Sequence, residues 1–452
     1  MLFEKRPRVL MSKRLARVAP RSALAYRGSM AAARKPKTAS PDAAPYDVII
    51  VGGGFVGGTL ALTLAKQAPK GFRIALVDAA PPSSGKSVRK DPRGLALSAA
   101  TKNLFEAIGL WPALEKSAQP IRSIEITDSP LNASLRPHLL GFDDEMKSGE
   151  PDAYLVEAGE LLRAVCDAVA KEKRINCFAP ETVSEFDVDG FGVRVHLASD
   201  ATLKGQLLVA ADGKRSGLRQ RAGIKTIGWT YPQAGIVATV AHERPHHGKA
   251  VQHFLPAGPF AILPLNGDRS SIVWSEEPER AQQLMAGSED AFVAELTRRF
   301  GHRLGEIKLD GPRQSFPLEL QIARAFVADR LALVGDAAHA VHPLAGQGLN
   351  IGMRDVAALA ETVVETARLG LDIGSPTTLE RYQRWRRFDS AFSATVMDGI
   401  NRLFSNDNVS LRGVRALGLG LVDRAPRLKR FLVREAAGGT GDVPRLLKGE
   451  GL

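Results

Sequence analysis

A glycine-rich turn between two short apolar segments constrains the fold of this chain more than any other feature of its sequence. The turn belongs to the stretch "YDVIIVGGGFVGGTLALTLAKQAPKGFRIALVDA", which covers residues 46–79. The β-branched run at 47–51 predicts a strand, the apolar segment 59–66 predicts a helix, and residues 73–77 predict a second strand. Two strands joined through a helix normally lie parallel in one sheet, so this unit predicts a doubly wound α/β domain.

Three glycines in this turn have the G-x-G-x-x-G spacing of dinucleotide-binding proteins. Gly52 permits the tight turn, Gly54 lets the backbone approach a pyrophosphate, and Gly57 allows the helix to pack closely on the strand. The start of the helix offers free N–H groups to the phosphates, and Asp78 can accept a hydrogen bond from a ribose hydroxyl. A glycine-rich turn without a ligand is the alternative, but the flanking strands and the carboxylate favour a dinucleotide. The unit does not distinguish NAD from FAD.

Two later stretches repeat the pattern of an apolar strand that ends at an aspartate. The first, "QLLVAADGKRSGLRQRAG" (206–223), runs into Asp212. The second, "LVGDAAHAVHPLAGQGLNIG" (333–352), runs into Asp336 before a helix that begins near Gly346. We expect Asp336 to contact a ribose or ribityl hydroxyl. We expect the N–H groups after Gly346 to face an oxygen on the redox-active ring of the bound cofactor, which becomes negative when the cofactor is reduced.

Two histidines in the second of these stretches raise the question of a metal site. His339 and His342 lie three residues apart, but the sequence offers no convincing further ligand beside them. Packing or hydrogen bonding within the loop is therefore the favoured interpretation, and we predict no metal site.

The three blocks, in this order and spacing, resemble those of the flavoprotein aromatic hydroxylases, and more narrowly those of the ubiquinone-biosynthesis hydroxylase family. The segments that strengthen this resemblance are "DPRGLALS" (91–98), "GPFAILPL" (258–265) and "FLVREAAGGTGDVPRLLKG" (431–449). The resemblance extends from about Tyr46 to the end of the chain. It implies that the dinucleotide is FAD, bound without a covalent link.

The resemblance also implies which residues hold the cofactor. The adenosine end of FAD is assigned to Gly52, Gly54, Gly57 and Asp78. Arg93 resembles the flavin-proximal arginine of the family, Asp212 lies at the mid-chain block, and Asp336 would bind the ribityl and pyrophosphate region. The residues expected to line the isoalloxazine are Pro343, Gly346, Gly348, Leu349 and Asn350.

The implied enzyme is an FAD-dependent monooxygenase that takes electrons from NADH or NADPH and uses O2 as co-substrate. Through a flavin hydroperoxide it would hydroxylate the aromatic ring of a polyprenylated phenol in ubiquinone biosynthesis. Because the flavin carries the chemistry, no catalytic side chain is assigned. Two alternatives stay open: a flavin dehydrogenase or reductase of the same fold, and a non-catalytic FAD-binding assembly factor of the ubiquinone pathway.

The expected fold class is α/β, with a doubly wound FAD-binding domain like that of para-hydroxybenzoate hydroxylase, an inserted β-sheet substrate domain and a C-terminal helical region. The FAD-binding domain is expected to be discontinuous and to comprise residues 46–120, 152–225 and 318–395. The substrate domain is expected at 121–151 and 226–317, and the helical region at 396–452.

The positive charge of the chain lies mostly in an N-terminal extension, residues 1–45. The formal net charge is +12, and the extension carries eleven Lys and Arg against Glu4 and Asp42, which leaves +3 for the rest. We therefore expect a disordered basic extension and no nucleic-acid groove in the folded part. The extension is either a transit peptide or the result of an upstream start, since Met11 and Met30 are internal.

The sequence predicts a cytoplasmic protein, or a mitochondrial one if the extension is a transit peptide. Cys166 and Cys177 show no pairing pattern, which is typical of a reducing compartment. No apolar run of about 18 residues predicts a membrane span. The stretch "VSLRGVRALGLGLVDRAPRLKRFLV" (409–433) mixes Leu, Val and Arg at roughly helical spacing. This favours either a helix packed on the FAD domain or a face that binds the inner-membrane surface, near other ubiquinone-pathway enzymes.

Overall fold

A mostly parallel sheet surrounds the strand that precedes the glycine-rich turn. The computed structural model describes residues 44–81, 91–128, 138–142, 151, 153–342, 346–405 and 442–452. Within these ranges the sheet has eight strands: β1 (Tyr46–Val51), β2 (Ile74–Val77), β8 (Ile175–Phe178), β9 (Val183–Asp189), β10 (Gly192–Leu197), β11 (Thr202–Ala210), β18 (Val327–Ala328) and β19 (Leu331–Leu333). The order is β18-β19-β11-β1-β2-β8, and β10 and β9 continue antiparallel beside β11.

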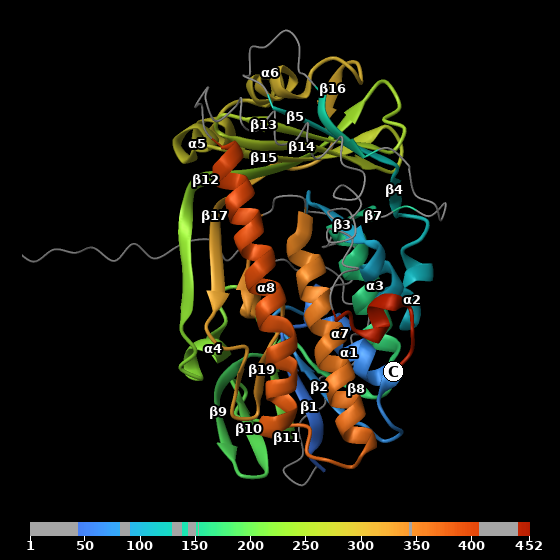
Figure 1. Cartoon of the computed structure of the whole chain (residues 1–452), viewed down its shortest axis with the longest axis vertical. Helices are drawn as coiled ribbons and strands as arrows, with labels where there is room; N and C mark the ends of the chain where they lie inside the picture. Colours follow the sequence, from blue (N-terminus) through green and yellow to red (C-terminus); the bar gives the residue numbers. More distant parts are fainter. Residues whose placement is uncertain are drawn as a thin grey trace, which may run out of the picture. The chain divides into compact units, whose positions relative to one another are not determined.

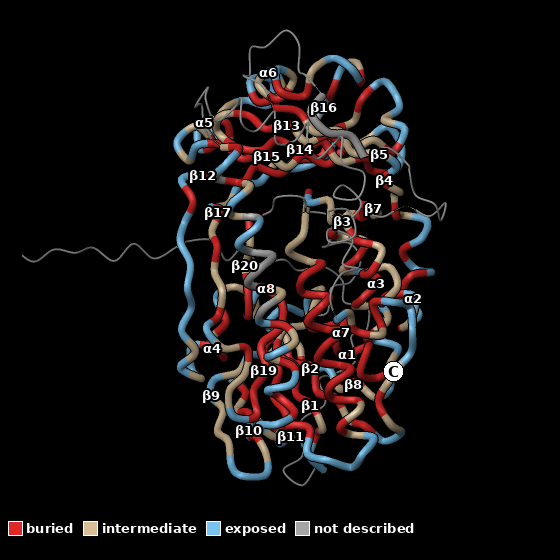
Figure 2. The backbone as a smooth tube through the Cα atoms, in the orientation of Figure 1, coloured by how far each residue is buried: buried red, intermediate tan, exposed pale blue. Residues whose placement is uncertain are grey.

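The central strands of this sheet are continuous apolar runs. Ile49 and Ile50 on β1 pair with Leu208 and Val209 on β11, and all four side chains are fully buried. Such runs are typical of parallel strands that helices cover on both faces. Figure 2 shows the resulting concentration of buried residues around β1, β2 and β19. The strand, helix and strand predicted from the glycine-rich stretch are all present.

The helices pack on this sheet and on a second one (Figure 1). The helix predicted at 59–66 begins earlier, at Phe55. A Cβ on Gly352 would lie 2.9 Å from Cγ2 of Val56, so this glycine allows α1 (Phe55–Gln67) to lie against α7 (Gln347–Arg368). The helices are α1 (Phe55–Gln67), α2 (Ala99–Ala107), α3 (Ala158–Lys171), α4 (Gly217–Arg221), α5 (Pro278–Ala286), α6 (Glu289–Phe300), α7 (Gln347–Arg368) and α8 (Pro376–Phe404), with short 3-10 turns η2 (Trp111–Ala113), η3 (Gly335–Ala337) and η5 (Arg445–Lys448).

The second sheet is almost entirely antiparallel, and α5 and α6 cover its outer face (Figure 1). Its core contains Phe260 and Trp274 from the sheet packed with Phe292 and Leu296 of α6. In the described residues its strands are β5 (Ser123–Asp128), β6 (His138–Phe142), β12 (Thr226–His242), β13 (Lys249–Leu255), β14 (Gly258–Leu265), β15 (Arg269–Glu276), β16 (Ile307–Leu309), β17 (Gln314–Ala323) and β20 (His339–Ala340). Their order is β20-β17-β12-β15-β14-β13-β5-β6, with β16 beside β12.

A small third sheet and the long helix α8 connect these two parts. The small sheet has the order β3-β7-β4, where β3 is Gly94–Ser98, β4 is Gln119–Ile121 and β7 is Ala153–Glu157. On α8, the hydroxyl of Tyr382 donates to the Leu333 carbonyl of β19 at 2.7 Å. Farther along α8, Asp398 accepts from the hydroxyl of Tyr231 on β12, also at 2.7 Å. One helix therefore contacts both large sheets.

The domain boundaries drawn from the sequence remain predictions. The boundary at residue 318 falls inside β17, which pairs with β12 in the antiparallel sheet. The basic extension up to residue 43 and the stretch 409–433 lie outside the described residues. None of the helices in the described ranges is both long and apolar enough to cross a bilayer.

Candidate functional site

The glycine-rich turn connects β1 to α1 along a path that only glycine allows. Gly52 has a φ of +104°, and a Cβ at this position would lie 2.2 Å from the carbonyl oxygen of Ala211. A Cβ on Gly57 would lie 1.9 Å from the carbonyl oxygen of Gly52. Around the Cβ position of Gly54, by contrast, no atom of the described residues lies within 4 Å, apart from its neighbours in the chain. The turn is therefore tightly packed on its inner side and open at Gly54.

The N-terminus of α1 is suited to bind an anion. Gly54 is the N-cap, no side chain of the described chain caps the helix, and the first turn carries no acidic residue. The free N–H groups and the positive end of the helix dipole stabilise a phosphate at such a position. Asp78 accepts hydrogen bonds from the N–H groups of Gly53 and Ala80, which hold its carboxylate beside the turn. This geometry fits the pyrophosphate and the adjacent ribose of FAD.

Asp336 lies in the short turn η3, directly after β19. Solvent reaches its side chain, yet the surrounding protein desolvates the carboxylate and raises its pKa. Arg93 is held by a two-pronged ion pair with Asp91, with Nη2 and Oδ2 2.6 Å apart. The hydrogen bond with Asp91, and to a smaller degree the charge of Asp336, raise the pKa of Arg93.

Asp212 has one carboxylate oxygen available for a ligand. Its Oδ2 accepts from the N–H groups of Gly217 at 2.9 Å and Leu218 at 3.3 Å, and so caps the start of α4. Its Oδ1 is buried and has no hydrogen-bond partner in the part of the chain that the structure describes. A buried acceptor without a partner is costly, so a ligand or a water molecule is expected to satisfy it.

Asn350 ties the first turn of α7 to β3 and α2. Its Oδ1 accepts from the Ser98 N–H at 2.9 Å and from the Thr101 hydroxyl at 2.8 Å, and its Nδ2 donates to the Ala96 carbonyl at 2.9 Å. Gly346, with a φ of +64°, is the N-cap of α7. The amide of Asn350 is thus engaged with the protein, and its direct effect is to fix the N-terminus of α7.

Residues on either side of this N-terminus are only partly described. Pro343 lies outside the described residues, whereas Gly348 and Leu349 lie half-buried in the first turn of α7. Burial lowers the pKa of His342 to about 4, so its ring is neutral near pH 7. The ring packs edge-on against Tyr231, with centroids 5.2 Å apart. This fits the packing role expected from the sequence.

A buried ionic network supports the turn that carries Asp336. Asp355 of α7 is completely buried. Its Oδ2 accepts from the Gly335 N–H at 2.9 Å and lies 2.6 Å from Nε2 of His339. Its Oδ1 accepts from Nε of Arg386 at 2.8 Å. Burial alone would raise the pKa of Asp355, but the charges of His339 and Arg386 and their hydrogen bonds lower it. Gly335 on η3 and His339 on β20, which Asp355 holds, lie on either side of Asp336 in the sequence. The network therefore fixes the direction of the Asp336 carboxylate.

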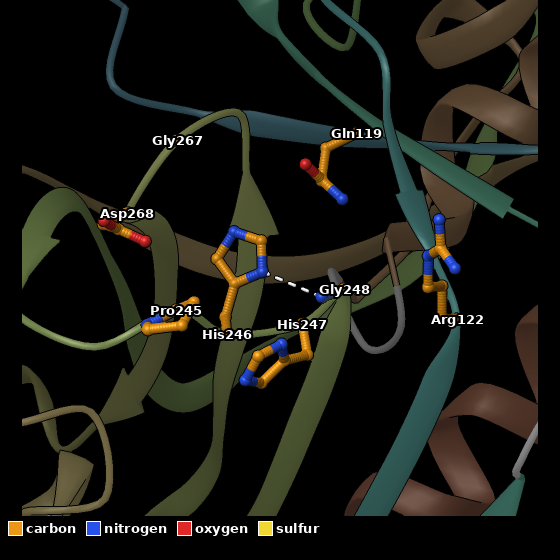
Figure 3. A pocket seen from close by; sticks show the side chains of 8 residues that line it. All are labelled: Gln119, Arg122, Pro245, His246, His247, Gly248, Gly267 and Asp268. Carbon is orange, nitrogen blue, oxygen red and sulfur yellow. Dashed lines mark hydrogen bonds between the residues drawn. The ribbon is translucent and has the colours of Figure 1, made fainter.

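A separate hollow of about 440 Å³ lies between β4 and the turns next to β13 and β15 (Figure 3). It is lined by Gln119, Arg122, Pro245, His246, His247, Gly248, Gly267 and Asp268. Both ring nitrogens of His246 are used by the local backbone, because Nε2 lies 2.7 Å from the Leu265 carbonyl and Nδ1 accepts from the Gly248 N–H. None of the residues predicted to hold FAD lines this hollow.

Comparison with known proteins identifies the family to which this chain belongs. A family model for an FAD binding domain matches residues 45–391. Ubiquinone hydroxylase UbiL of Rhodospirillum rubrum is 43% identical over 427 residues, which cover 93% of this chain and 97% of that relative. This chain belongs to the FAD-dependent ring hydroxylases of ubiquinone biosynthesis. The hydroxylase also shares 34% identity with the 3-demethoxyubiquinol 3-hydroxylase of Escherichia coli, with 87% of this chain and 99% of the relative covered.

A solved structure confirms the predicted fold class of this hydroxylase. The p-nitrophenol 4-monooxygenase PnpA from Pseudomonas putida DLL-E4 aligns with a TM-score of 0.71 at 21% identity, over 88% of this chain and 99% of that one. The α/β fold with a separate, mostly antiparallel sheet is therefore that of the flavin monooxygenases. The hydroxylase is an FAD-dependent aromatic monooxygenase, as predicted.

The structure brings the two glycine-rich blocks together and contains ion pairs that the sequence does not predict. The two glycine blocks meet where Val56 of α1 lies against Gly335, whose Cβ position is 3.0 Å from Cγ2 of Val56. Sequence reasoning missed Asp91, which orients Arg93, and the pair of Asp355 with Arg386. Asp355 had a weak signal, because a charged residue in an otherwise apolar helix segment needs a buried partner. Nothing in the sequence identifies that partner as Arg386.

Proposed function

We propose that the hydroxylase binds FAD at the glycine-rich turn, takes electrons from NADH or NADPH, and uses O2 to hydroxylate the ring of a polyprenylated phenol in ubiquinone biosynthesis. The observation that carries this proposal is the 43% identity to a ubiquinone hydroxylase along nearly the full length of both chains. When bound, FAD supplies the redox chemistry and the activation of oxygen.

The residues of the chain would bind and orient the cofactor. The N-terminus of α1 at Gly54 would hold the pyrophosphate, and Asp78 would accept from the adenosine ribose. Asp336 would accept from the ribityl chain, and Arg93 would lie beside the flavin ring. The N–H groups at the start of α7, near Gly346 and Gly348, would stabilise negative charge on the ring.

The protein would also have to keep water away from the reacting atoms. The antiparallel sheet lies against this region, because the hydroxyl of Thr239 donates to the Pro92 carbonyl at 3.3 Å and the N–H of Gly94 donates to the hydroxyl of Ser271 at 2.9 Å. These contacts join the sheet to Pro92 and Gly94, the two residues next to Arg93 in the sequence. A ring bound between Arg93 and the sheet would be shielded from solvent.

Substrate-dependent incorporation of labelled oxygen tests the proposal directly. Purified protein should be yellow with bound FAD, and with NADH or NADPH and 18O2 it should transfer one labelled atom to a prenylated phenol. Quinone intermediates that accumulate in a deletion strain, identified by mass spectrometry, would give the ring position. NAD(P)H oxidation without labelled product, or normal ubiquinone in a deletion strain that lacks any paralogue, would reject the proposal.

We also propose that the hydroxylase acts at a membrane surface, because a long isoprenoid chain is nearly insoluble in water. The segment that supports this, residues 409–433, lies outside the described residues. Basic side chains near an anionic membrane contribute about 1 kcal/mol each. Changing Arg427, Lys429 and Arg430 to Glu should therefore weaken binding to anionic vesicles in a salt-dependent way and leave the FAD content unchanged. Equal vesicle binding by variant and wild type would reject the surface role.

A further inference from the structure

The antiparallel sheet has an inner face, which we define as the face opposite α5 and α6. Along β13, Val251 and Leu255 point into the outer core with these helices, so Gln252 and Phe254 point to the inner face. On β14, Phe260 and Ile262 belong to the outer core, so Ala261 and Leu263 point to the inner face. On β15, Ile272 and Trp274 belong to the outer core, so Ser271 and Val273 point to the inner face. Phe254 packs against Phe404 of α8, with ring centroids 4.2 Å apart, which confirms that its side of the sheet faces α8.

One position on each of the three central strands interrupts an otherwise buried inner face. Gln252, Leu263 and Val273 are only half-buried, although strands pair on both sides of each of them. Every other inner-face residue of β13, β14 and β15 is buried, apart from Arg269 at the start of β15. The three positions are neighbours, because Ala261 pairs with both Gln252 and Val273, and Leu263 follows two residues later on the same face. Together with Ala261 they form one patch on the inner face that solvent partly reaches, and we call this patch the recess.

This recess lies on the same side of the sheet as Arg93. Ser271, which accepts from the Gly94 N–H, pairs with Leu263 across β14 and β15. Neighbouring strands lie about 4.8 Å apart, and β14 separates β13 from β15. Gln252 on β13 is therefore about 10 Å from β15, which is roughly the length of a substituted aromatic ring. A ring placed in this recess would extend from the region of Arg93 towards Gln252.

Gln252 provides the only polar side chain among the half-buried positions of the recess. In the described part of the chain, its Nε2 is buried without a hydrogen-bond partner. The two residues that pair directly with it on the inner face are apolar: Ile126 of β5 and Ala261 of β14. An amide donor buried among apolar groups is costly unless a ligand or a water molecule accepts from it.

We infer that Gln252 is a substrate-positioning residue, whose amide Nε2 donates a hydrogen bond to an oxygen on the aromatic ring of the substrate. This inference rests on the proposed function. Leu263, Val273 and Ala261 contact the apolar part of the ring, and Gln252 selects rings that carry an oxygen at the matching position. A site built to hydrogen-bond a substrate oxygen discriminates against an analogue that lacks it, because the donor is then left unpaired.

The test compares a phenol with a short prenyl chain and the corresponding prenylated benzene without the hydroxyl group. Binding of each to the FAD-loaded protein is measured from the change in flavin absorbance. In Gln252→Met, which keeps the length of the side chain but has no donor, the Kd of the phenol should rise about tenfold, the effect of one net hydrogen bond. The Kd of the benzene should change little, so the preference for the phenol should disappear.

Leu263→Met is the matched control, because it alters the shape of the same recess without changing its hydrogen bonding. It should keep the preference for the phenol. FAD content and melting temperature should equal those of the wild type in both variants, and Gln252→Leu replaces Gln252→Met if the latter loses FAD.

Two results would overturn the inference in different ways. If the wild type prefers the phenol and the Gln252 variant keeps that preference, Gln252 does not position the ring, whereas the proposed function stands. If the wild-type holoenzyme binds neither compound and hydroxylates no prenylated phenol, the proposed function is wrong and the role of Gln252 is rejected with it.

Discussion

Replacing Asp355 by asparagine should weaken both the fold and the binding of FAD. The substitution preserves the volume of the side chain, but an amide keeps only one acceptor oxygen and turns an NH2 group towards Arg386 or the Gly335 N–H. Removing one partner from a buried ion pair costs about 3–5 kcal/mol. Arg386 still has Asp389 as a partner, so we expect the free energy of unfolding to fall by about 3 kcal/mol, the lower end of this range.

This loss translates into a modest shift of the melting temperature. Unfolding entropy is about 2.1 cal/mol/K per residue, so a folded part of roughly 400 residues should lose about 4 °C for a change of 3 kcal/mol. The folded pKa of Asp355 lies below its ordinary value, so its ionised form stabilises the fold above a pH of about 4, and this contribution is lost as the pH falls through the folded pKa. The difference between variant and wild type should therefore hold from about pH 5 to 8 and shrink in stronger acid.

The binding of FAD separates a positioning role from a general loss of stability. Because Gly335 and His339 flank Asp336, the Kd for FAD, measured by quenching of flavin fluorescence, should rise about tenfold or more in Asp355→Asn. Asp389→Asn is the control, since Asp389 contacts Arg354 and Arg386 but not the turn. The reasoning is refuted if Asp355→Asn has the same melting temperature as the wild type, or if both variants lose FAD affinity equally.

Three further predictions address the cofactor residues and the extension. Asp336→Ala should lose FAD affinity by about 1–3 kcal/mol, through a missing charged acceptor, in an equilibrium titration; full retention of affinity would show that Asp336 does not contact the cofactor. Gly54→Ala should fold, because in the described residues no atom beyond its chain neighbours lies within 4 Å of its Cβ position, but it should bind FAD weakly. Gly57→Ala should not give folded protein, because its Cβ would meet the Gly52 carbonyl oxygen at 1.9 Å. Circular dichroism and flavin content check both variants, and a folded, yellow Gly57→Ala would contradict the packing argument. Deletion of residues 1–29 should leave flavin content and activity intact, because a segment without apolar periodicity contributes little to a core; a truncated protein that precipitates would show that the extension is structural.

Local patterns in the sequence predicted the strand, turn and helix at the glycine-rich stretch, because spacing and residue type determine such units. The start of α1 was placed four residues too late, since Gly57 and Gly58 lower helix propensity, but tertiary packing requires small residues there. The network of Asp355 and Arg386 could not be predicted, because ion-pair partners 31 residues apart are chosen by how two helices pack. The amide of Gln252 was missed for a similar reason, since a single glutamine in a strand shows its importance only when the burial of its neighbours is known.

The strand order of the parallel sheet has a consequence for how the protein is made. β11 pairs with β1 on one side and with β19 on the other, but β19 follows β11 by more than a hundred residues of chain that build the antiparallel sheet. At about 5–20 residues per second, the ribosome needs roughly 6–25 s to synthesise the segment between Ala210 and Leu333. During this interval the nascent chain carries an apolar strand edge without its final neighbour. Chaperone capture of the half-made protein should therefore concentrate on β11, and the parallel sheet can be completed only after β19 has emerged.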